Sequence, residues 1–174
     1  LHEVGINAEE VDYIMATSVT GLATPSLEAR LVSIVGFRPD VKRVPIFGLG
    51  CVAGAAGIAR VHDYLLGHPD DVAVLLSVEL CSLTLQADDM SMANIVSSGL
   101  FGDGAAAVVM VGNRRAKRMG IQGPRVIDSR SKIYPDTEET MAWNIGGSGF
   151  HIVLTSSVSD IVAQNIGGEV REFL

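Results

Sequence analysis

The stretch Val44-Pro45-Ile46-Phe47-Gly48-Leu49-Gly50-Cys51-Val52-Ala53-Gly54 joins a short apolar run to two glycines, a cysteine and a run of small residues. The β-branched and aromatic residues of Val44 to Phe47, bounded by glycine, predict a buried strand. From Ala53 to about Leu66 the apolar residues recur at helical spacing, which predicts a helix that stops at Gly67. Cys51 is therefore expected at a strand-to-helix turn. The expected buried face of the helix consists of Ala55, Ile58, Ala59, Val61, Leu65 and Leu66.

A cysteine at the start of a helix has a chemical interpretation. Unpaired backbone N–H groups and the positive end of the helix dipole favour the thiolate form of Cys51. The thiolate is the nucleophilic form of cysteine, so the position suits covalent catalysis. The other interpretation is a small buried hydrophobe, which is the commoner role of a lone cysteine. The geometry of this turn alone does not decide between the nucleophilic and the packing interpretation.

The composition describes a globular chain. It has 174 residues, of which 48% are hydrophobic and 19% charged, enough for one domain with a substantial core. The net charge of −7 argues against a nucleic-acid partner, because no basic stripe offsets it. The one basic cluster is interpreted as part of a solvated loop. Its members are Arg114, Arg115, Lys117 and Arg118.

The two cysteines, Cys51 and Cys81, lie without metal-ligand spacing and do not suggest a disulfide scaffold. No apolar run approaches the length of a membrane span, and no signal peptide is visible. These observations predict a protein of the reducing cytoplasm that holds no metal.

Strand and helix patterns alternate along the rest of the chain. A strand is expected within Val11 to Ser18, and a helix from Ser26 to about Val35 that stops at Gly36. Nearly continuous apolar runs predict two fully buried strands, at 72–78 and 105–111. The alternation implies a mostly parallel α/β sheet. Further expected elements are a short helix at 90–98, a loose linker at 112–123, strand-like pieces at 125–128 and 150–154, and a closing helix at 157–172.

The glycine turn also supports a rival function. Residues Gly48 to Ala53 fit the dinucleotide-binding pattern G-x-G-x-x-A, follow an expected strand and open an expected helix. Glu79 ends the next strand, where an acid could bind a ribose hydroxyl. This alternative is an NAD(P)-dependent oxidoreductase, and it leaves Cys51 without a role.

A second motif, Gly99-Leu100-Phe101-Gly102-Asp103-Gly104-Ala105-Ala106, joins the cysteine turn and Ser77-Val78-Glu79 in a recognisable order. Together they resemble the type III polyketide synthases, the chalcone- and stilbene-synthase-like enzymes of the thiolase fold. The segments 38–44 and 149–151 agree with the same family. The resemblance implies a thiolase-like layered αβαβα fold, incomplete here. Residues 1–174 would form one partial ketosynthase domain, from the end of its first half into its second.

The resemblance also implies a role for individual residues. Cys51 matches the cysteine that accepts the starter acyl group, and Phe101 and Phe150 match two aromatic residues that guard the cavity. For the cavity-lining positions, simple core packing is the alternative interpretation. Thr24 and Cys81 differ from the plant enzymes and resemble the bacterial, alkylpyrone-synthase-like branch. Met141 also differs from the plant enzymes, which usually have glycine there, and is expected to narrow the cavity. The full set of implied cavity-lining residues is Thr20, Thr24, Cys81, Thr84 and Met141.

The implied activity is loading of an acyl-CoA on Cys51 and decarboxylative Claisen extension with malonyl-CoA to a pyrone or phenolic product. The coenzyme A thioesters are substrates, no separate cofactor is implied, and a homodimer is expected. The remaining alternative is a non-catalytic remnant that only dimerises.

Family members use a histidine and an asparagine for decarboxylation, and none of the four histidines fits that role. His62 lies roughly 16 Å along the helix from Cys51. His151 alternates with Phe150 on its strand and faces away if Phe150 faces the cavity. The chain is therefore expected to be the middle of a synthase and inactive by itself.

Overall fold

The computed structural model describes all residues from 1 to 174 and divides them into two compact units. Unit 1 comprises Leu1–Leu80 and Asp103–Ser129, and unit 2 comprises Cys81–Gly102 and Arg130–Leu174. The chain therefore passes between the units after Leu80, Gly102 and Ser129. The expectation of one partial domain over 1–174 stays a prediction.

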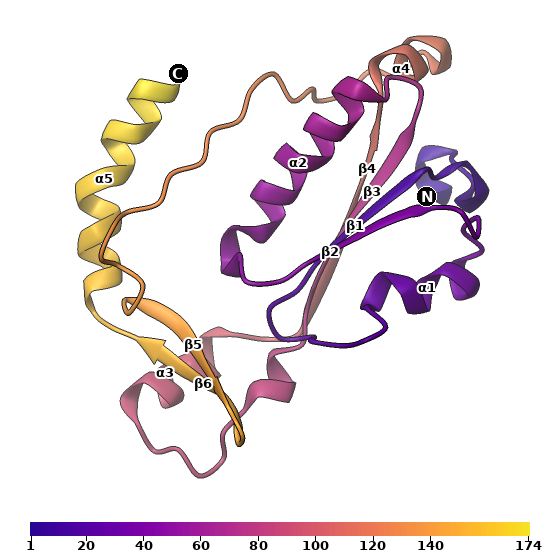
Figure 1. Ribbon diagram of the computed structural model, residues 1–174. Helices are drawn as coiled ribbons and strands as arrows, with labels where there is room; N and C mark the ends of the chain where they lie inside the picture. Colours follow the sequence, from indigo (N-terminus) through magenta and orange to yellow (C-terminus); the bar gives the residue numbers. More distant parts are fainter. The chain divides into compact units, whose positions relative to one another are not determined.

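Unit 1 is built on a four-stranded sheet with the order β2-β1-β3-β4 (Figure 1). β1 pairs with β2 and β3 in parallel, and β4 pairs with β3 in the antiparallel direction. The prediction of a mostly parallel sheet is thus confirmed for this unit. The strands are β1 (Tyr13–Thr17), β2 (Lys42–Ile46), β3 (Val72–Glu79) and β4 (Gly104–Val111).

Helices cover both faces of this sheet. Side chains alternate along a strand, so Ile14 and Met15 of β1 point to opposite faces. Ile14 belongs to a buried cluster that includes Val32 of α1, and Met15 to a second cluster that includes Val61 of α2. Figure 1 shows the two helices on either side of the strands. The helices of unit 1 are α1 (Leu27–Val35), α2 (Ala53–Gly67) and α4 (Asn113–Met119), with 3-10 turns η1 (His2–Val4), η2 (Ala8–Glu10) and η3 (Gly50–Val52).

The long helix α2 lies close to the sheet at Gly57. A β-carbon built there would come within 2.6 Å of a terminal carbon of Leu75 on β3. The prediction of buried positions was wrong for Ala55 and Leu66, which are exposed. The helix instead turns its small residues toward the strands, which lets the backbones approach.

Two strands predicted as buried lie at the edges of the sheet. β2 is exposed along most of its length, with Val44 37% and Phe47 just beyond it 47% exposed. β4 is exposed from Gly104 to Val108. An edge strand has a neighbour on one side only, and the covering helices pack over the middle of the sheet. Apolar composition alone therefore overestimated the burial of both strands.

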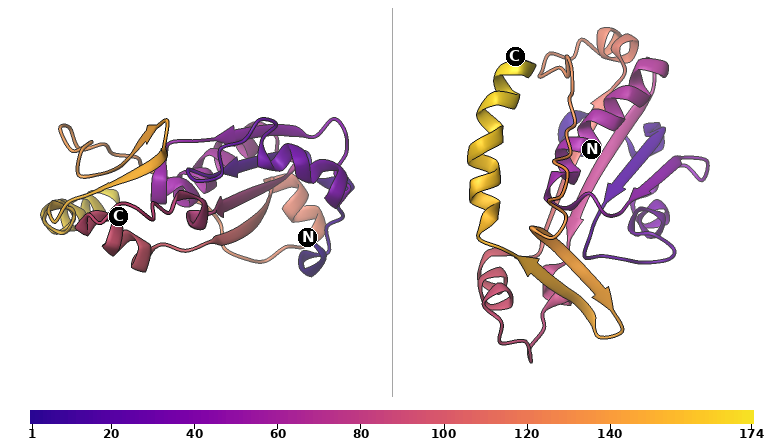
Figure 2. Two further views of the ribbon diagram at one scale, coloured as in Figure 1. Left: turned by 90° about the horizontal axis from the view of Figure 1, so that it is seen from below. Right: turned by 60° about the vertical axis from the view of Figure 1, so that its left-hand side comes forward.

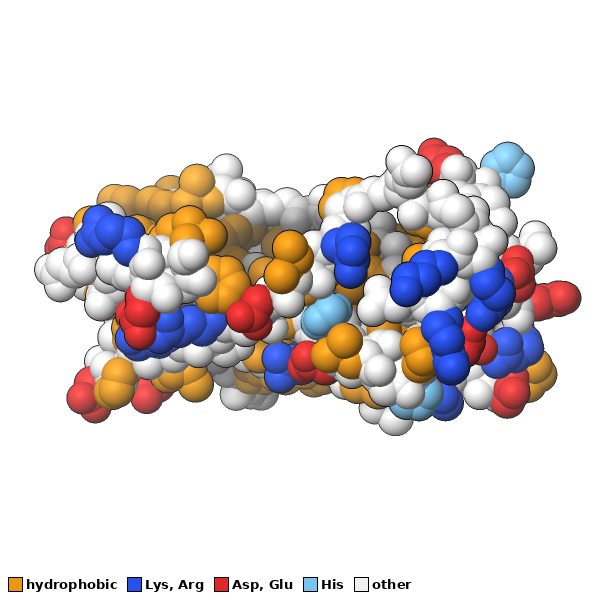
Figure 3. Space-filling model, turned by 90° about the horizontal axis from the view of Figure 1, so that it is seen from above, with side chains coloured by type: hydrophobic (Ala, Val, Ile, Leu, Met, Phe, Trp, Pro, Cys, Tyr) orange, Lys and Arg blue, Asp and Glu red, His pale blue; other side chains and the backbone are white.

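The segment predicted as a loose basic linker contains α4. Its arginines form ion pairs with acidic residues of other segments, among them Arg114 with Asp70 at 2.6 Å and Arg115 with Glu10. Arg118 also pairs with Asp70, and the two guanidinium groups hold the pKa of this carboxyl below its usual range. Figure 3 shows basic and acidic side chains interspersed on this view of the molecule, without a continuous basic field.

Unit 2 contains an antiparallel hairpin, β5 (Met141–Gly146) with β6 (Gly149–Leu154). The helices α3 (Met92–Leu100) and α5 (Ser157–Phe173) confirm two predicted helices, and η4 (Cys81–Thr84) is a 3-10 turn. α3 packs against β6.

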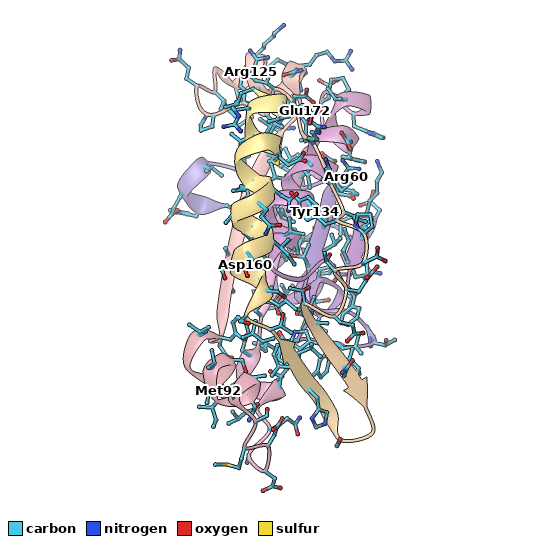
Figure 4. The ribbon with its side chains drawn as sticks, turned by 90° about the vertical axis from the view of Figure 1, so that its left-hand side faces the viewer. Arg60, Met92, Arg125, Tyr134, Asp160 and Glu172 are labelled. Atoms are coloured by element: carbon cyan, nitrogen blue, oxygen red, sulfur yellow. The ribbon has the colours of Figure 1, made fainter.

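The stretch that precedes β5 runs beside α5 (Figure 2). Arg130 pairs with Glu172 at 2.9 Å, and Lys132 pairs with Glu169. Figure 4 labels Glu172 near the end of α5 and Asp160 near its start. The arginine lowers the pKa of Glu172. The strand predicted at 125–128 was wrong, because this stretch is irregular.

Candidate active site

Cys51 lies where the sequence places it, in the turn between β2 and α2. It occupies the middle of η3, two residues before Ala53, the first residue of α2, and it is exposed. Gly48 and Gly50 have φ angles of 91° and 58°, which side-chain-bearing residues rarely adopt. The two glycines thus provide the backbone bend that presents the thiol at the surface of unit 1.

Thr20 follows β1 and is buried. Its hydroxyl donates a hydrogen bond to the Glu79 carboxylate and accepts one of 2.7 Å from the backbone N–H of Leu80. The same carboxylate accepts the backbone N–H groups of Val19 and Thr20, each at 3.2 Å. Both hydrogen-bonding capacities of the threonine hydroxyl are therefore used inside unit 1.

This geometry removes the support for the alternative function, an NAD(P)-dependent oxidoreductase that binds its dinucleotide at the Gly48 to Ala53 turn. Glu79 binds the backbone after β1, so its carboxylate is not presented to a ribose. The strand that precedes the glycine turn, β2, lies at the sheet edge, and β1 separates it from β3. In the dinucleotide fold the glycine-rich strand and the strand bearing the acid are neighbours.

Thr24 lines a cavity of about 540 Å³ in unit 1, together with Arg43 and Phe47. Glu28, on the first turn of α1, lies in the same wall and is fully buried. Its carboxylate accepts hydrogen bonds from the Ser26 hydroxyl and from Arg43, the latter at 3.3 Å. Sequence reasoning missed Glu28, because acidic residues in a first helical turn usually face water.

The β5–β6 hairpin places two predicted cavity residues on one face. Met141 lies opposite Leu154 and Phe150 opposite Ile145, and residues two apart on a strand share a face. Met141 and Phe150 therefore point to the same side. The Trp143 ring stands edge-on to the Phe150 ring, with 5.9 Å between centroids and 84° between planes.

The histidine next to Phe150 faces the other side, as predicted. The Nε2 atom of His151 lies 2.8 Å from the Ser148 hydroxyl at the hairpin turn. His68 follows α2, and its Nδ1 atom lies 2.9 Å from the carbonyl oxygen of Tyr64. These local partners account for the orientation of both imidazole rings.

The other predicted residues of unit 2 lie on elements around the hairpin. Cys81 and Thr84 occupy η4, and the Thr84 hydroxyl donates a 2.8 Å hydrogen bond to the Cys81 carbonyl. Phe101 directly follows the last residue of α3, and its backbone N–H donates to the Ser97 carbonyl at 2.9 Å. Both η4 and α3 contact β6. Unit 2 thus gathers five of the eight predicted site residues on η4, at the end of α3 and on the β5–β6 hairpin.

One residue that sequence reasoning missed joins these elements. The side-chain amide of Gln86 donates to the Phe150 carbonyl at 3.1 Å and approaches the Ser148 carbonyl at 3.4 Å. Asn94 of α3 donates in turn to the Gln86 and Asp89 carbonyls, at 2.9 and 2.7 Å. No short-range pattern signals a contact between residues so far apart in the chain.

Comparisons with known proteins show the family to which this chain belongs. Residues 1–122 match the family described as FAE1/Type III polyketide synthase-like protein. The whole chain is 56% identical to a 1,3,6,8-tetrahydroxynaphthalene synthase of Streptomyces peucetius subsp. caesius and covers 46% of it. Over 169 residues, 95% of the chain, it is 37% identical to a putative chalcone synthase of Bacillus subtilis (strain 168), of which it also covers 46%.

The crystal structure of 1,3,6,8-tetrahydroxynaphthalene synthase from Streptomyces coelicolor A3(2) superposes with a TM-score of 0.80 at 34% identity, over 90% of this chain and 43% of that one. The fold is thus the mixed α/β fold of the thiolase class, which confirms the predicted fold class. The chain belongs to the type III polyketide synthase family. It spans about half the length of the curated relatives it matches. None of its helices combines the length and the apolar character needed to cross a bilayer.

Proposed function

We propose that this protein is a type III polyketide synthase that loads an acyl-CoA on Cys51 and extends it with malonyl-CoA. The observation that carries the proposal is the exposed thiol in the turn before α2, within a region that matches the family from residue 1 to 122. A buried cysteine in this turn would have favoured a packing role instead.

The loading step is an acyl transfer between thiols. The Cys51 thiolate attacks the thioester carbonyl, the bond from that carbon to the coenzyme A sulfur breaks, and coenzyme A leaves as a thiolate that takes up a proton. In the extension step malonyl-CoA loses CO₂, and the resulting carbanion attacks the acyl carbonyl on Cys51. The new carbon–carbon bond releases the cysteine sulfur. Both coenzyme A thioesters enter as substrates, and the proposal includes no metal or further cofactor.

The cavity residues have separable roles in this proposal. Phe101 and Phe150 guard the entrance of the acyl chain, and Met141, which shares a face with Phe150, narrows the same region. The hydroxyls of Thr20 and Thr84 already donate to other atoms of the protein. These two residues therefore contribute shape rather than a hydrogen-bond donor to the substrate. Thr24 and Cys81 complete the proposed lining.

The names of the relatives favour a phenolic product over a pyrone. They include 1,3,6,8-tetrahydroxynaphthalene synthases, a phloroglucinol synthase of Pseudomonas fluorescens and a 3,5-dihydroxyphenylacetyl-CoA synthase of Streptomyces toyocaensis. Each of these names describes a hydroxylated aromatic ring. We propose a product of this class, made by a homodimer.

The test uses the protein expressed from its complete coding sequence. Intact mass spectrometry after incubation with an acyl-CoA is expected to show one added acyl group, lost in Cys51→Ala and retained in Cys81→Ala. Incubation with labelled malonyl-CoA is expected to release CO₂ and give a phenolic product. Acylation that maps to Cys81, or turnover by Cys51→Ala, would refute the assignment.

A further inference from the structure

We propose that Gln86 is a positioning residue for Phe150. The side-chain amide of Gln86 fixes the start of β6 and thereby sets which acyl chain lengths the cavity accepts. The inference rests on the proposed function of Phe150 as a guard of the cavity. Gln86 belongs to neither the catalytic turn nor the predicted lining, and it acts through the backbone of the hairpin.

The side-chain amide of Gln86 contacts the hairpin backbone at Phe150 itself. The Gln86 amide nitrogen lies 3.1 Å from the carbonyl oxygen of Phe150 and 3.4 Å from that of Ser148, on either side of Gly149. Gly149 has a φ of 108°, and a β-carbon there would lie 3.1 Å from the same nitrogen. Glycine thus permits both the turn and the close approach of the amide.

Gln86 is itself held from the other side. Its backbone carbonyl accepts a 2.9 Å hydrogen bond from Asn94 of α3, a side chain only 9% exposed. Asn94 also donates to the Asp89 carbonyl at 2.7 Å, which closes the loop between η4 and α3. Two amide side chains therefore connect α3 to the hairpin in series, and such a network restrains every member more than a single bond does.

The hairpin depends on this support because it has only two strands. An isolated two-stranded hairpin is marginally stable in water. Gly147 lies in its turn and Gly146 and Gly149 flank the turn, so the local sequence adds little stiffness. Phe150 is the first side chain after this turn, and its position follows from wherever the backbone of Gly149 is held.

The test compares Gln86→Leu and Gln86→Glu with Gln164→Leu. Both Gln86 variants lose the amide donor, and the glutamate keeps the size of the side chain. Gln164 is exposed on α5 and offers the same substitution away from the hairpin. The measurement is kcat/KM for acetyl-, hexanoyl- and dodecanoyl-CoA, in the protein expressed from its complete coding sequence. The ratio of long to short starters is expected to change on the order of tenfold in both Gln86 variants. The ratio in Gln164→Leu is expected to stay unchanged.

A second readout needs no activity. Trp143 is the only tryptophan of this chain and packs edge-on against Phe150. The Trp143 contribution to the emission, taken as the difference between each protein and its Trp143→Phe counterpart, is expected to shift in both Gln86 variants without any substrate, and not in Gln164→Leu. Unchanged starter ratios with unchanged Trp143 emission would overturn the role of Gln86 while acyl loading on Cys51 persists. Failure of the unaltered protein to load any acyl-CoA would instead refute the proposed function, and the starter-selecting role with it.

Discussion

Glu79 at the end of β3 holds the chain that leaves β1 by accepting hydrogen bonds from Thr20, both from its hydroxyl and from its backbone N–H. A third donor, the backbone N–H of Val19, points to the same carboxylate. One acidic side chain thus satisfies the polar groups of a turn 59 and 60 residues earlier in the sequence. The predicted cavity residue Thr20 owes its orientation to this contact.

Substitution of Glu79 by glutamine is expected to destabilise unit 1. The amide keeps one acceptor oxygen, and its NH₂ group faces backbone donors. Since hydrogen bonds to charged groups contribute about 1.5–3 kcal/mol, we expect the free energy of unfolding to fall by roughly 2 kcal/mol in Glu79→Gln. Urea unfolding measures the change, with Glu3→Gln on the exposed η1 turn as the control. Equal losses in the two variants would contradict a stabilising role of the Glu79 hydrogen bonds to Val19 and Thr20.

Alkaline pH is expected to destabilise the protein through Tyr64. Its hydroxyl donates to Asp71 at 2.6 Å and accepts from Lys42 at 2.7 Å. Burial, and then the Asp71 carboxylate, raise the pKa of Tyr64 above its ordinary value of about 10. Below that pH the folded and unfolded states both keep the proton, and the stabilisation is complete. Above it the unfolded tyrosine ionises first, so the free energy of unfolding falls as the pH rises.

Urea unfolding between about pH 9 and 11.5 tests this pH dependence. Tyr64→Phe is expected to show a smaller loss of stability over that range. Some slope is expected to remain, because burial also raises the pKa of Tyr13. A Tyr64→Phe profile as steep as that of the unaltered protein would show that this hydroxyl does not control the alkaline behaviour.

Gly57→Ala is expected to destabilise the contact between α2 and β3. The new methyl group would meet Leu75 side-chain carbons at 2.6 and 3.0 Å, and Leu75 is only 2% exposed, which leaves it little room to move. Overpacking of this kind costs about 1–3 kcal/mol, more than alanine gains over glycine in a helix. Gly67→Ala, at the end of the same helix with nothing within 4 Å, is the control. Thermal and urea unfolding that rank the variants in the opposite order would contradict the close packing.

Limited alkylation is expected to label Cys51 before Cys81. Cys51 is exposed in the turn before α2, and Cys81 is half-buried in η4. Iodoacetamide treatment of the folded protein, followed by peptide mapping, should show a preference on the order of tenfold for Cys51. The preference should disappear in urea. Faster labelling of Cys81 in the folded state would argue against the proposed nucleophile.

Local patterns predicted the elements whose ends are marked by glycine. α1 ends before Gly36, which has the left-handed φ of 84° expected of a helix stop, and α2 extends to Gly67. The placement of Cys51 followed from the same reasoning. These features depend on residues within one turn of each other, so a single stretch of sequence contains the information.

Features that depend on distant neighbours were missed. The prediction that β2 is buried was wrong, because the position of this strand at the sheet edge depends on which strands pair and not on its own residues. β5 was not predicted, because its strand geometry depends on its pairing with β6 and not on a pattern in its own residues. Glu28 and Gln86 owe their roles to Arg43 and to the hairpin turn, which lie far from them in the chain.

The pairing of β3 with β4 has a consequence for the stretch of chain that connects them. An antiparallel pair needs only a short turn to connect it, yet here the chain makes an excursion through residues 81–102 of unit 2 before it returns. The ladder from Val72 to Val111 holds both ends of this excursion in register. Cys81, Thr84 and Phe101 all lie on the excursion through residues 81–102. Because a longer loop adds only slightly to the entropic cost of closing it, we expect insertions in this excursion to leave the pairing of β3 with β4, and the sheet beside the Cys51 turn, intact.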